Sequence, residues 1–244
     1  MTNYIRELSG KQYLKRIEDS YTAIVPIGAC EVYGTHLPMG QDLIVAKRIS
    51  ELVSEKTGAL IAPTIEIGES SALDTFQCTF SLPRNVIEGF LDYLVGKLLD
   101  DGFKNILFLS GHAGNVEIVN YVVKRYQKTH NFNAAQIDWW RFTQHYSDDV
   151  LDFTGAMAHG HAAECGTSVM LYLYPELVDL DSMEKTTPKD NSKFKDIITI
   201  ETLDKKTENG TVGDPRTASR EKGEKIVNKC VDRIVEYMNE KFTK

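Results

Sequence analysis

The sequence predicts an α/β fold with a mainly parallel sheet flanked by helices on both faces. Two observations lead to this prediction. Short apolar runs alternate with longer stretches of helical spacing, and clusters of polar residues follow the strand-like runs. Such alternation is typical of parallel strands joined by helical crossovers. At 244 residues the chain is within the size range of one α/β domain, so we expect a single domain over residues 1–244.

The first half of the chain contains two expected strands on either side of a helix. Residues 22–28 (TAIVPIG) are apolar and β-branched and end in glycine, which predicts a buried strand. Residues 42–58 place apolar side chains on one side at helical spacing, and Gly58 provides the stop. The apolar run 59–67 (ALIAPTIEI) is the second expected strand, and it leads into a loop at 68–75.

The second half continues the alternation. The stretch 86–99 is amphipathic, and Gly102 lies just beyond its end. Residues 105–110 (NILFLS) form the clearest buried strand in the sequence. The remaining expected elements are a strand at 133–138 and helices at 115–128, 164–174 and 217–241. The polar, turn-rich region 181–215 is interpreted as an excursion from the domain.

Composition argues against several classes of protein. The chain has 28 basic and 35 acidic side chains and no dense basic stripe, so we expect no nucleic-acid partner. No segment approaches membrane-spanning length and the N-terminus has no apolar leader, so we expect no membrane association and a cytoplasmic location. The four cysteines show no CxxC spacing, which argues against a zinc finger or a redox pair.

The first polar cluster follows strand 22–28. It contains Glu31, His36 and Asp42, which are side chains that divalent metals use as ligands. In an open parallel sheet, ligands bind just beyond the carboxyl ends of the strands, which is where this cluster lies. The alternative is ordinary loop polarity, with Asp42 as the N-cap of the following helix.

Two further clusters lie at comparable positions. His112 follows strand 105–110 between two glycines, so its imidazole is directed into the crevice at the strand ends, or it satisfies a local carbonyl in a tight turn. His161 and Glu164 are three residues apart, so they project from one face if the helix has already begun. Their spacing does not match the four-residue spacing of zinc-protease helices, and packing is the alternative interpretation.

Together these clusters resemble the motifs of the creatininase (creatinine amidohydrolase) family. The segment from Glu31 to Asp42 resembles E-x-H-G-x-H-L-P-x-x-x-D, and the turn around His112 resembles N-G-H-G-G-N. The segment that starts at His161 resembles H-A-G-x-x-E-T-S, and Gly210–Pro215 is similar to a closing G-x-x-G-D-P stretch. The motifs occur in the same order from about residue 20 to residue 240, so the resemblance covers nearly the whole chain.

The resemblance implies a metal-dependent hydrolase with an α/β fold, often hexameric, whose founding member opens a cyclic amide at a two-metal site. It implies that Glu31, Asp42 and His112 hold one metal, and that Asp42 can bridge to a second. His161 matches a histidine that moves protons. His36 matches a histidine near the metals and is a further candidate ligand. We therefore expect a divalent cofactor (Zn, Mn or Fe), a small-molecule substrate and a homo-oligomer, most simply a hexamer.

The chain departs from the family motifs at two places that bear on metal binding. Tyr33 stands where the first motif has a histidine, and Gly166 stands where E-T-S has its acid. A neutral tyrosine is a poor ligand at pH 7, because its pKa near 10 leaves little phenolate. We therefore expect one tightly held metal, and any second ion to be weak and dependent on Glu164 or His36.

Several aromatic and acidic residues have more than one interpretation. Tyr33 could donate a hydrogen bond to a developing oxyanion, or it could pack in the core. Glu164 could assist His161 in proton transfer. Trp139 and Trp140 follow a predicted strand and could line a pocket for a flat substrate. Adjacent side chains of an extended chain point to opposite faces, so we expect at most one of them to do so.

The favoured function is hydrolysis of a C–N bond in a small cyclic amide or formamide. A second possibility keeps the metal but changes the bond, since the family resemblance also covers C–C hydrolases that open cyclic sugar-like ketones. A third is a metal-free binding protein on the same fold. The departures at Tyr33 and Gly166 favour the third possibility, whereas the retained Glu31, Asp42 and His112 argue against it.

Overall fold

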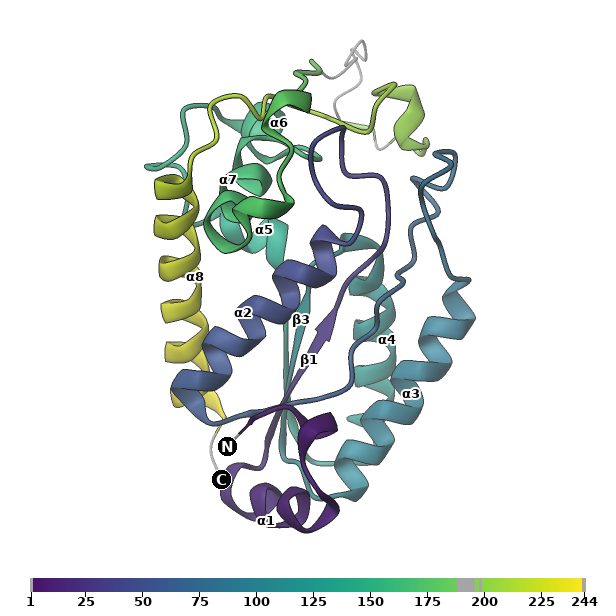
Figure 1. The fold of residues 1–244 in the computed structure, drawn as a ribbon. Coiled ribbons are helices and arrows are strands. Elements are labelled where there is room, and N and C mark those ends of the chain that lie inside the picture. Colours follow the sequence, from purple (N-terminus) through teal and green to yellow (C-terminus); the bar gives the residue numbers. More distant parts are fainter. Residues whose placement is uncertain (1, 188–195, 198, 243–244) are drawn as a thin grey trace.

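The computed structural model describes residues 2–187, 196–197 and 199–242, and this part of the chain is built around a four-stranded parallel sheet (Figure 1). The strands lie in the order β2-β1-β3-β4, and every neighbouring pair is parallel. Their bounds are Thr22–Ile27 for β1, Leu60–Ile61 for β2, Asn105–Ser110 for β3 and Asn133–Asp138 for β4. The predicted α/β class with a parallel sheet is confirmed.

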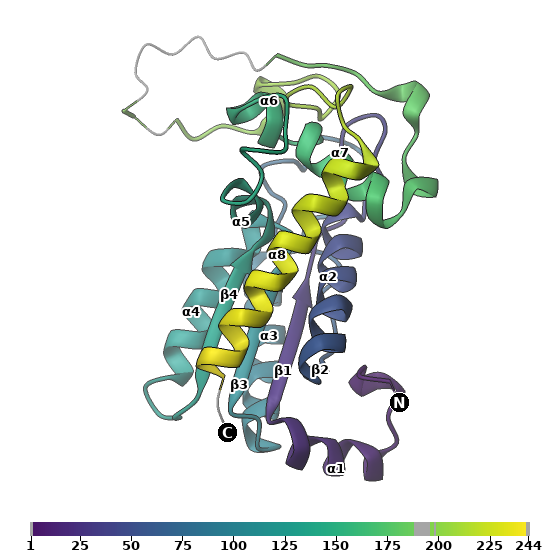
Figure 2. The same cartoon turned by 90° about the vertical axis from the view of Figure 1, so that its left-hand side faces the viewer.

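Helices cover both faces of the sheet, as predicted (Figures 1 and 2). One core cluster joins β1 through Ile24 to α2 (Gln41–Thr57) and α8 (Arg220–Lys241). The other joins β1 through Val25 to α3 (Arg84–Asp100) and α4 (Val116–Tyr126). Successive side chains of a strand point to opposite faces, so β1 contributes to both cores, and every residue of it after Thr22 is apolar.

One predicted strand is much shorter than expected. The run 59–67 was expected to be a strand, but only Leu60–Ile61 pairs with β1 as a ladder. The N–H of Ala62 still donates to the carbonyl of Ile24, but Pro26 of β1 has no N–H with which to continue the ladder on this side, so regular pairing stops there. The chain touches the sheet again at a single bridge between Ile65 and Ile27.

The five predicted helices are present, with ends shifted by a few residues. They are α2, α3, α4, α7 (Glu164–Leu173) and α8. Among the described residues, three more α-helices were not predicted: α1 (Gly10–Ser20), α5 (Trp139–Gln144) and α6 (Gly155–His159). Helix α1 carried a sequence signal, because Ser9 and Gln12 form a capping box at its start. Short 3-10 turns occupy Ile5–Glu7, Ala113–Asn115, Pro175–Leu177, Leu180–Ser182 and Leu203–Lys205.

The polar region 181–215 returns to the body of the domain. Residues 188–195 and 198 of this region lie outside the described residues. In the remainder, Gly213 pairs with Thr186 in an isolated antiparallel bridge. The N–H of Val212 donates to the carbonyl of His161 at 2.7 Å. The region therefore ends against the turn that carries His161, at the carboxyl end of the sheet.

The arrangement leaves all the candidate site residues at one end of the molecule. The carboxyl ends of the strands point toward α6, α7 and the loops around them, while both termini lie toward the opposite end (Figure 1). Within the described residues, no helix is both long and apolar enough to cross a membrane.

The packing of β3 makes a test of the core possible. Leu107 on β3 is fully buried, whereas Leu14 on α1 is 64% exposed. We expect Leu107→Ala to lower the free energy of unfolding by about 2–5 kcal/mol, because the cavity adds to the lost burial. The same truncation at Leu14 should change it by about 0.5 kcal/mol or less. Urea unfolding of both variants measures the difference, and equal losses would contradict this description of the core.

Candidate metal centre

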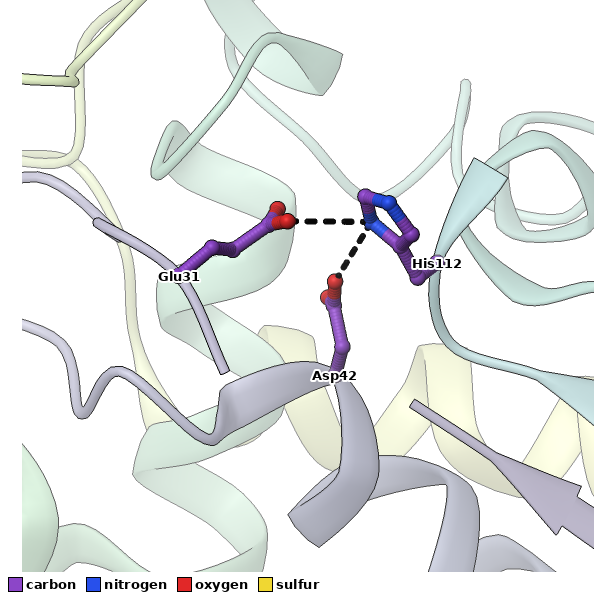
Figure 3. Close-up of side chains that lie close together, drawn as sticks. All are labelled: Glu31, Asp42 and His112. Carbon is purple, nitrogen blue, oxygen red and sulfur yellow. Dashed lines mark hydrogen bonds and ion pairs between the residues drawn. The ribbon is translucent and has the colours of Figure 1, made fainter. Parts of the chain in front are cut away.

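Three side chains from separate segments converge beyond the carboxyl ends of β1 and β3 (Figure 3). Glu31 lies in the loop after β1, Asp42 is the second residue of α2, and His112 follows β3. All three are buried. Nδ1 of His112 lies 3.1 Å from Oδ2 of Asp42 and 3.3 Å from Oε2 of Glu31. Among the residues that the structure describes, no other trio of His, Cys, Asp or Glu brings its ligand atoms together in this way.

The hydrogen bond on the far side of His112 decides which nitrogen faces the carboxylates. Nε2 lies 2.7 Å from the backbone carbonyl oxygen of Glu69. A carbonyl can only accept, so Nε2 carries a proton and donates it there. Nδ1 is then the nitrogen that can offer a lone pair to a metal. A metal-binding histidine is commonly oriented in this manner by a partner at its other nitrogen.

The charges of the cluster favour a cation at its centre. Burial lowers the pKa of His112, but hydrogen bonds and charge from Asp42 and Glu31 outweigh it and hold this pKa well above the usual value. Burial raises the pKa of Asp42. Burial also acts to raise the pKa of Glu31, but the bond and charge of His112 outweigh it and lower that pKa. Without a metal, a proton on Nδ1 balances part of the negative charge. A divalent ion can replace this proton, and two carboxylates with one imidazole suit Zn²⁺, Mn²⁺ or Fe²⁺.

Asp42 is held by a second partner rather than serving as a helix cap. The indole Nε1–H of Trp140 donates to Oδ1 of Asp42 at 2.8 Å, while Oδ2 faces His112. The N-cap position of α2 is Gly40, which makes no side-chain capping bond. The N-cap interpretation of Asp42 is therefore wrong.

A pocket of about 120 Å³ lies beside the cluster. Tyr33 and His161 stack on its wall with ring centroids 4.1 Å apart, and the ring of Trp140 lies 6.4 Å from that of Tyr33. The pocket is lined by Tyr33, Trp140, Thr143, His159, Gly160, His161, Ala162, Cys165 and Gly166. Trp139 is instead fully buried in the core, so only one of the two tryptophans lines this pocket, as expected. The reason differs from the expected one, because the two residues begin helix α5 and do not lie in an extended chain.

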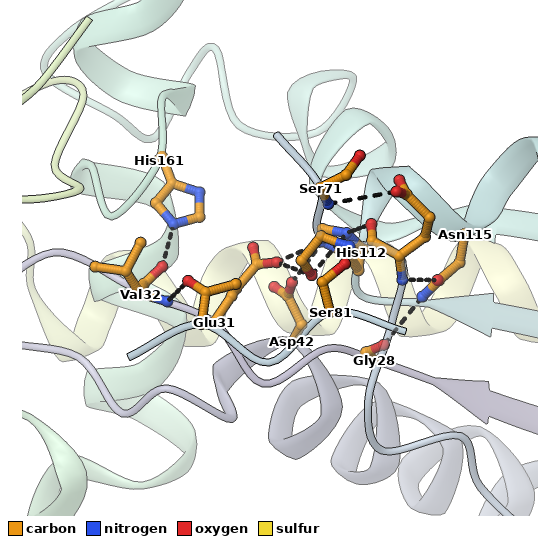
Figure 4. A network of polar contacts seen from close by, with 12 residues as sticks. Gly28, Glu31, Val32, Asp42, Ser71, Ser81, His112, Asn115 and His161 are labelled. Atoms are coloured by element: carbon orange, nitrogen blue, oxygen red, sulfur yellow. Dashed lines mark hydrogen bonds and ion pairs between the residues drawn. The ribbon is translucent and has the colours of Figure 1, made fainter. Parts of the chain in front are cut away.

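His161 has a defined tautomer. Its Nε2 donates to the carbonyl of Val32 at 2.7 Å, so Nδ1 is the nitrogen that can accept a proton (Figure 4). His161 lies in the turn before α7 and not on that helix. Ala162, between His161 and the helix, is buried and has a left-handed backbone with φ of 57°.

Tyr33 remains a neutral phenol in this environment. Burial raises its pKa well above the usual value, and the negative charges of Asp42 and Glu31 raise it further. The hydroxyl therefore keeps its proton, and the predicted hydrogen bond from Tyr33 to a developing oxyanion stays a prediction.

Two predicted site residues do not reach the cluster. His36 is buried, its Nε2 lies 2.9 Å from Oγ1 of Thr167, and burial lowers its pKa to about 4. The carboxylate of Glu164 accepts the N–H groups of Asp152 and Phe153 at 2.9 and 3.0 Å. It also forms an ion pair with Lys222 at 2.6 Å. Because α7 begins at Glu164, this residue and His161 do not share a helix face.

Two residues next to the cluster carried no sequence signal. Oγ of Ser70 donates to Oε2 of Glu31 at 2.5 Å, and Glu69 acts through its backbone carbonyl. Both lie in the segment that the sequence predicts only as a loop. A backbone acceptor leaves no trace in residue type, so only the structure reveals it.

The chain matches proteins of known activity over almost its whole length. The family model described as creatininase (creatinine amidohydrolase) matches residues 6–238. The creatinine amidohydrolase of Pseudomonas putida is 29% identical, over 98% of this chain and 97% of that protein. A mycofactocin precursor peptide peptidase of Mycolicibacterium smegmatis is 28% identical over 86% and 83%. A 3-dehydro-scyllo-inosose hydrolase of Thermotoga maritima is 26% identical over 76% of this chain and 61% of its own length.

Solved structures agree with this result. A structure described as creatininase with Mn superposes with a TM-score of 0.88 at 26% identity and covers all of both chains. A Zn–Zn form of a mutant creatininase gives the same TM-score and identity. The matched span includes every residue of the cluster described above, so the chain belongs to the creatininase family of metal-dependent hydrolases.

Proposed function

We propose that this protein, acting as one domain, hydrolyses a C–N bond of a small cyclic amide or formamide with one divalent ion held by Glu31, Asp42 and His112. The observation that carries the proposal is that Nδ1 of His112 faces two buried carboxylate oxygens, at 3.1 and 3.3 Å, close to a pocket with aromatic walls. The relatives named creatinine amidohydrolase and peptide peptidase support it, since both names describe cleavage of an amide bond.

The chemistry divides between the ion and the residues of the pocket. A divalent ion held by Glu31, Asp42 and His112 would supply Lewis acidity, which would polarise an amide carbonyl and lower the pKa of water. His161 acts as the general base and then the general acid through Nδ1, because Val32 fixes the proton on Nε2. Tyr33 packs against the imidazole and holds it over the pocket. Trp140 keeps Asp42 turned toward His112.

A second candidate is ring opening of a cyclic sugar-like ketone at a C–C bond. The relative named 3-dehydro-scyllo-inosose hydrolase favours it. The same residues would serve, because polarising a ketone and moving a proton need the same acid and base. Assays of lactams and formamides beside cyclic diketones distinguish the two candidates. The retained ligand set gives no support to a metal-free binding protein.

Charge balance favours a single tight ion. Glu31 and Asp42 carry two negative charges, which one divalent ion neutralises. A second ion would leave a net positive charge in a buried site, and such a charge is costly without a further carboxylate. Tyr33 is a neutral phenol, and Gly166 has no side chain. The carboxylate of Glu164 already has three partners.

Removing either of two ligands tests the centre. We expect Glu31→Gln and His112→Ala each to abolish metal retention and hydrolysis, because the remaining donors cannot compete with water for the ion. Elemental analysis of protein purified without chelator measures retention, and circular dichroism checks the fold. The exposed Glu66→Gln and His130→Ala are matched controls that should keep the metal. Parent-like metal content in either ligand variant would refute the assignment.

Metal stoichiometry tests the one-ion proposal separately. Calorimetric titration of the metal-free protein with Zn²⁺ should give one tight site per chain, and any second site should be at least about 100-fold weaker, or about 2.7 kcal/mol. Anomalous scattering from crystals of the loaded protein locates the ion. Two fully occupied sites, with Tyr33 or His36 beside the second ion, would overturn the proposal.

We also propose that the protein assembles as a hexamer, as the family resemblance implies. Light scattering coupled to size exclusion at micromolar concentration should give a mass near six times 27.5 kDa. A monomer at that concentration would contradict the proposal. This outcome leaves the metal assignment intact, because all three ligands come from one chain.

A further inference from the structure

The loop segment Gly68–Ser70 contacts two of the three candidate metal ligands. Ser70 is 1% exposed, and its Oγ lies 2.5 Å from Oε2 of Glu31. The neighbouring carbonyl of Glu69 accepts the Nε2 proton of His112 at 2.7 Å. One short segment, absent from the motifs that identify the family, therefore holds partners of both ligands.

The direction of the Ser70 hydrogen bond follows from its neighbours. The hydroxyl also lies 3.4 Å from Nε2 of His112, but Nε2 already gives its proton to Glu69 and presents no lone pair. The single hydroxyl proton therefore goes to Glu31. It reaches Oε2, which is the oxygen that faces Nδ1 of His112 at 3.3 Å. Ser70 thus adds a second partner, beside His112, that restricts the rotation of the Glu31 carboxylate about its last carbon–carbon bond.

The segment Gly68–Ser70 is itself hydrogen-bonded to residues that follow strands β1 and β3. Oδ1 of Asn115 accepts the N–H of Glu69 at 3.0 Å, and Nδ2 of Asn115 donates to the carbonyl of Gly28 at 2.9 Å. A side chain at Gly114 would place its Cβ 2.1 Å from the Glu69 carbonyl oxygen. A side chain at Gly68 would place its Cβ 2.7 Å from the Gly28 carbonyl oxygen. The close approach of the segment therefore requires glycine at both positions.

We propose that Ser70 is a positioning residue of the metal centre, and that the Gly68–Ser70 segment sets the affinity of the centre for its ion. The inference rests on the proposed metal function. Ser70 does not touch the ion in this scheme. It holds Glu31 in the orientation in which the carboxylate and Nδ1 of His112 face a common point. Partners of this kind change metal affinity by about 10- to 100-fold when they are lost.

Zinc affinity of Ser70 variants tests the inference. Competition between the protein and a chromophoric chelator gives the affinity for Zn²⁺, and the visible absorption of the Co²⁺-loaded protein reports the ligand geometry. We expect Ser70→Ala to bind Zn²⁺ about 10- to 100-fold more weakly and to show an altered Co²⁺ band. Ser71 is exposed and its side chain lies outside this network, so Ser71→Ala is the matched control and should behave as the parent.

A pair of nearly isosteric variants separates the hydroxyl from the packing. Ser70→Thr keeps a hydroxyl and Ser70→Val does not, while both add similar bulk. We expect the threonine variant to bind Zn²⁺ at least about 10-fold more tightly than the valine variant. Thermal unfolding of the metal-free proteins checks that both are folded. Equal affinities in this pair, or parent-like affinity in Ser70→Ala, would overturn the inference. A parent protein that binds no Zn²⁺ would instead refute the proposed function.

Discussion

Two carboxylates, Glu31 and Asp42, are buried side by side, and the rest of the centre is arranged around that constraint. Two like charges out of water are unfavourable unless a cation or a proton lies between them. His112, in the loop after the neighbouring strand β3, places Nδ1 between the two carboxylates. Its Nε2 donates to the backbone carbonyl of Glu69. The same arrangement that binds a proton in the metal-free protein can bind a divalent ion, so one geometry accounts for both states.

The sheet determines how these residues meet. Strands β1 and β3 are adjacent and in register, with Ile27 opposite Ser110, so the loops that follow them start at the same level. The first turn of helix α2 packs closely against Gly28 and Gly111, which follow these two strands, and Asp42 is the second residue of that helix. The ligands are separated by up to about 80 residues in the sequence, but parallel pairing of two strands brings them within reach of one ion.

The sequence was informative where a single residue type or the spacing of apolar residues determines the local structure. Strands β1, β3 and β4 end within a residue of their predicted limits, and the runs of β1 and β3 are each followed by a glycine. It carried no signal for partners that are distant or lie in the backbone. Glu164 pairs with Lys222, which is 58 residues away in the sequence, and its predicted catalytic role stays a prediction. The carbonyl of Glu69 has no sequence signature at all.

The left-handed backbone of Ala162 has a consequence for how far this fold can be stabilised. An alanine in that conformation costs about 1–2 kcal/mol relative to an ordinary turn residue. The turn is held in place by the hydrogen bond from Val212 to the His161 carbonyl and by the packing of Ala162 against Gly34. A glycine at 162 would relieve the strain in the folded chain but would also give the unfolded chain more conformational freedom. The two effects oppose each other, so the net gain in stability from this substitution is smaller than the strain alone suggests.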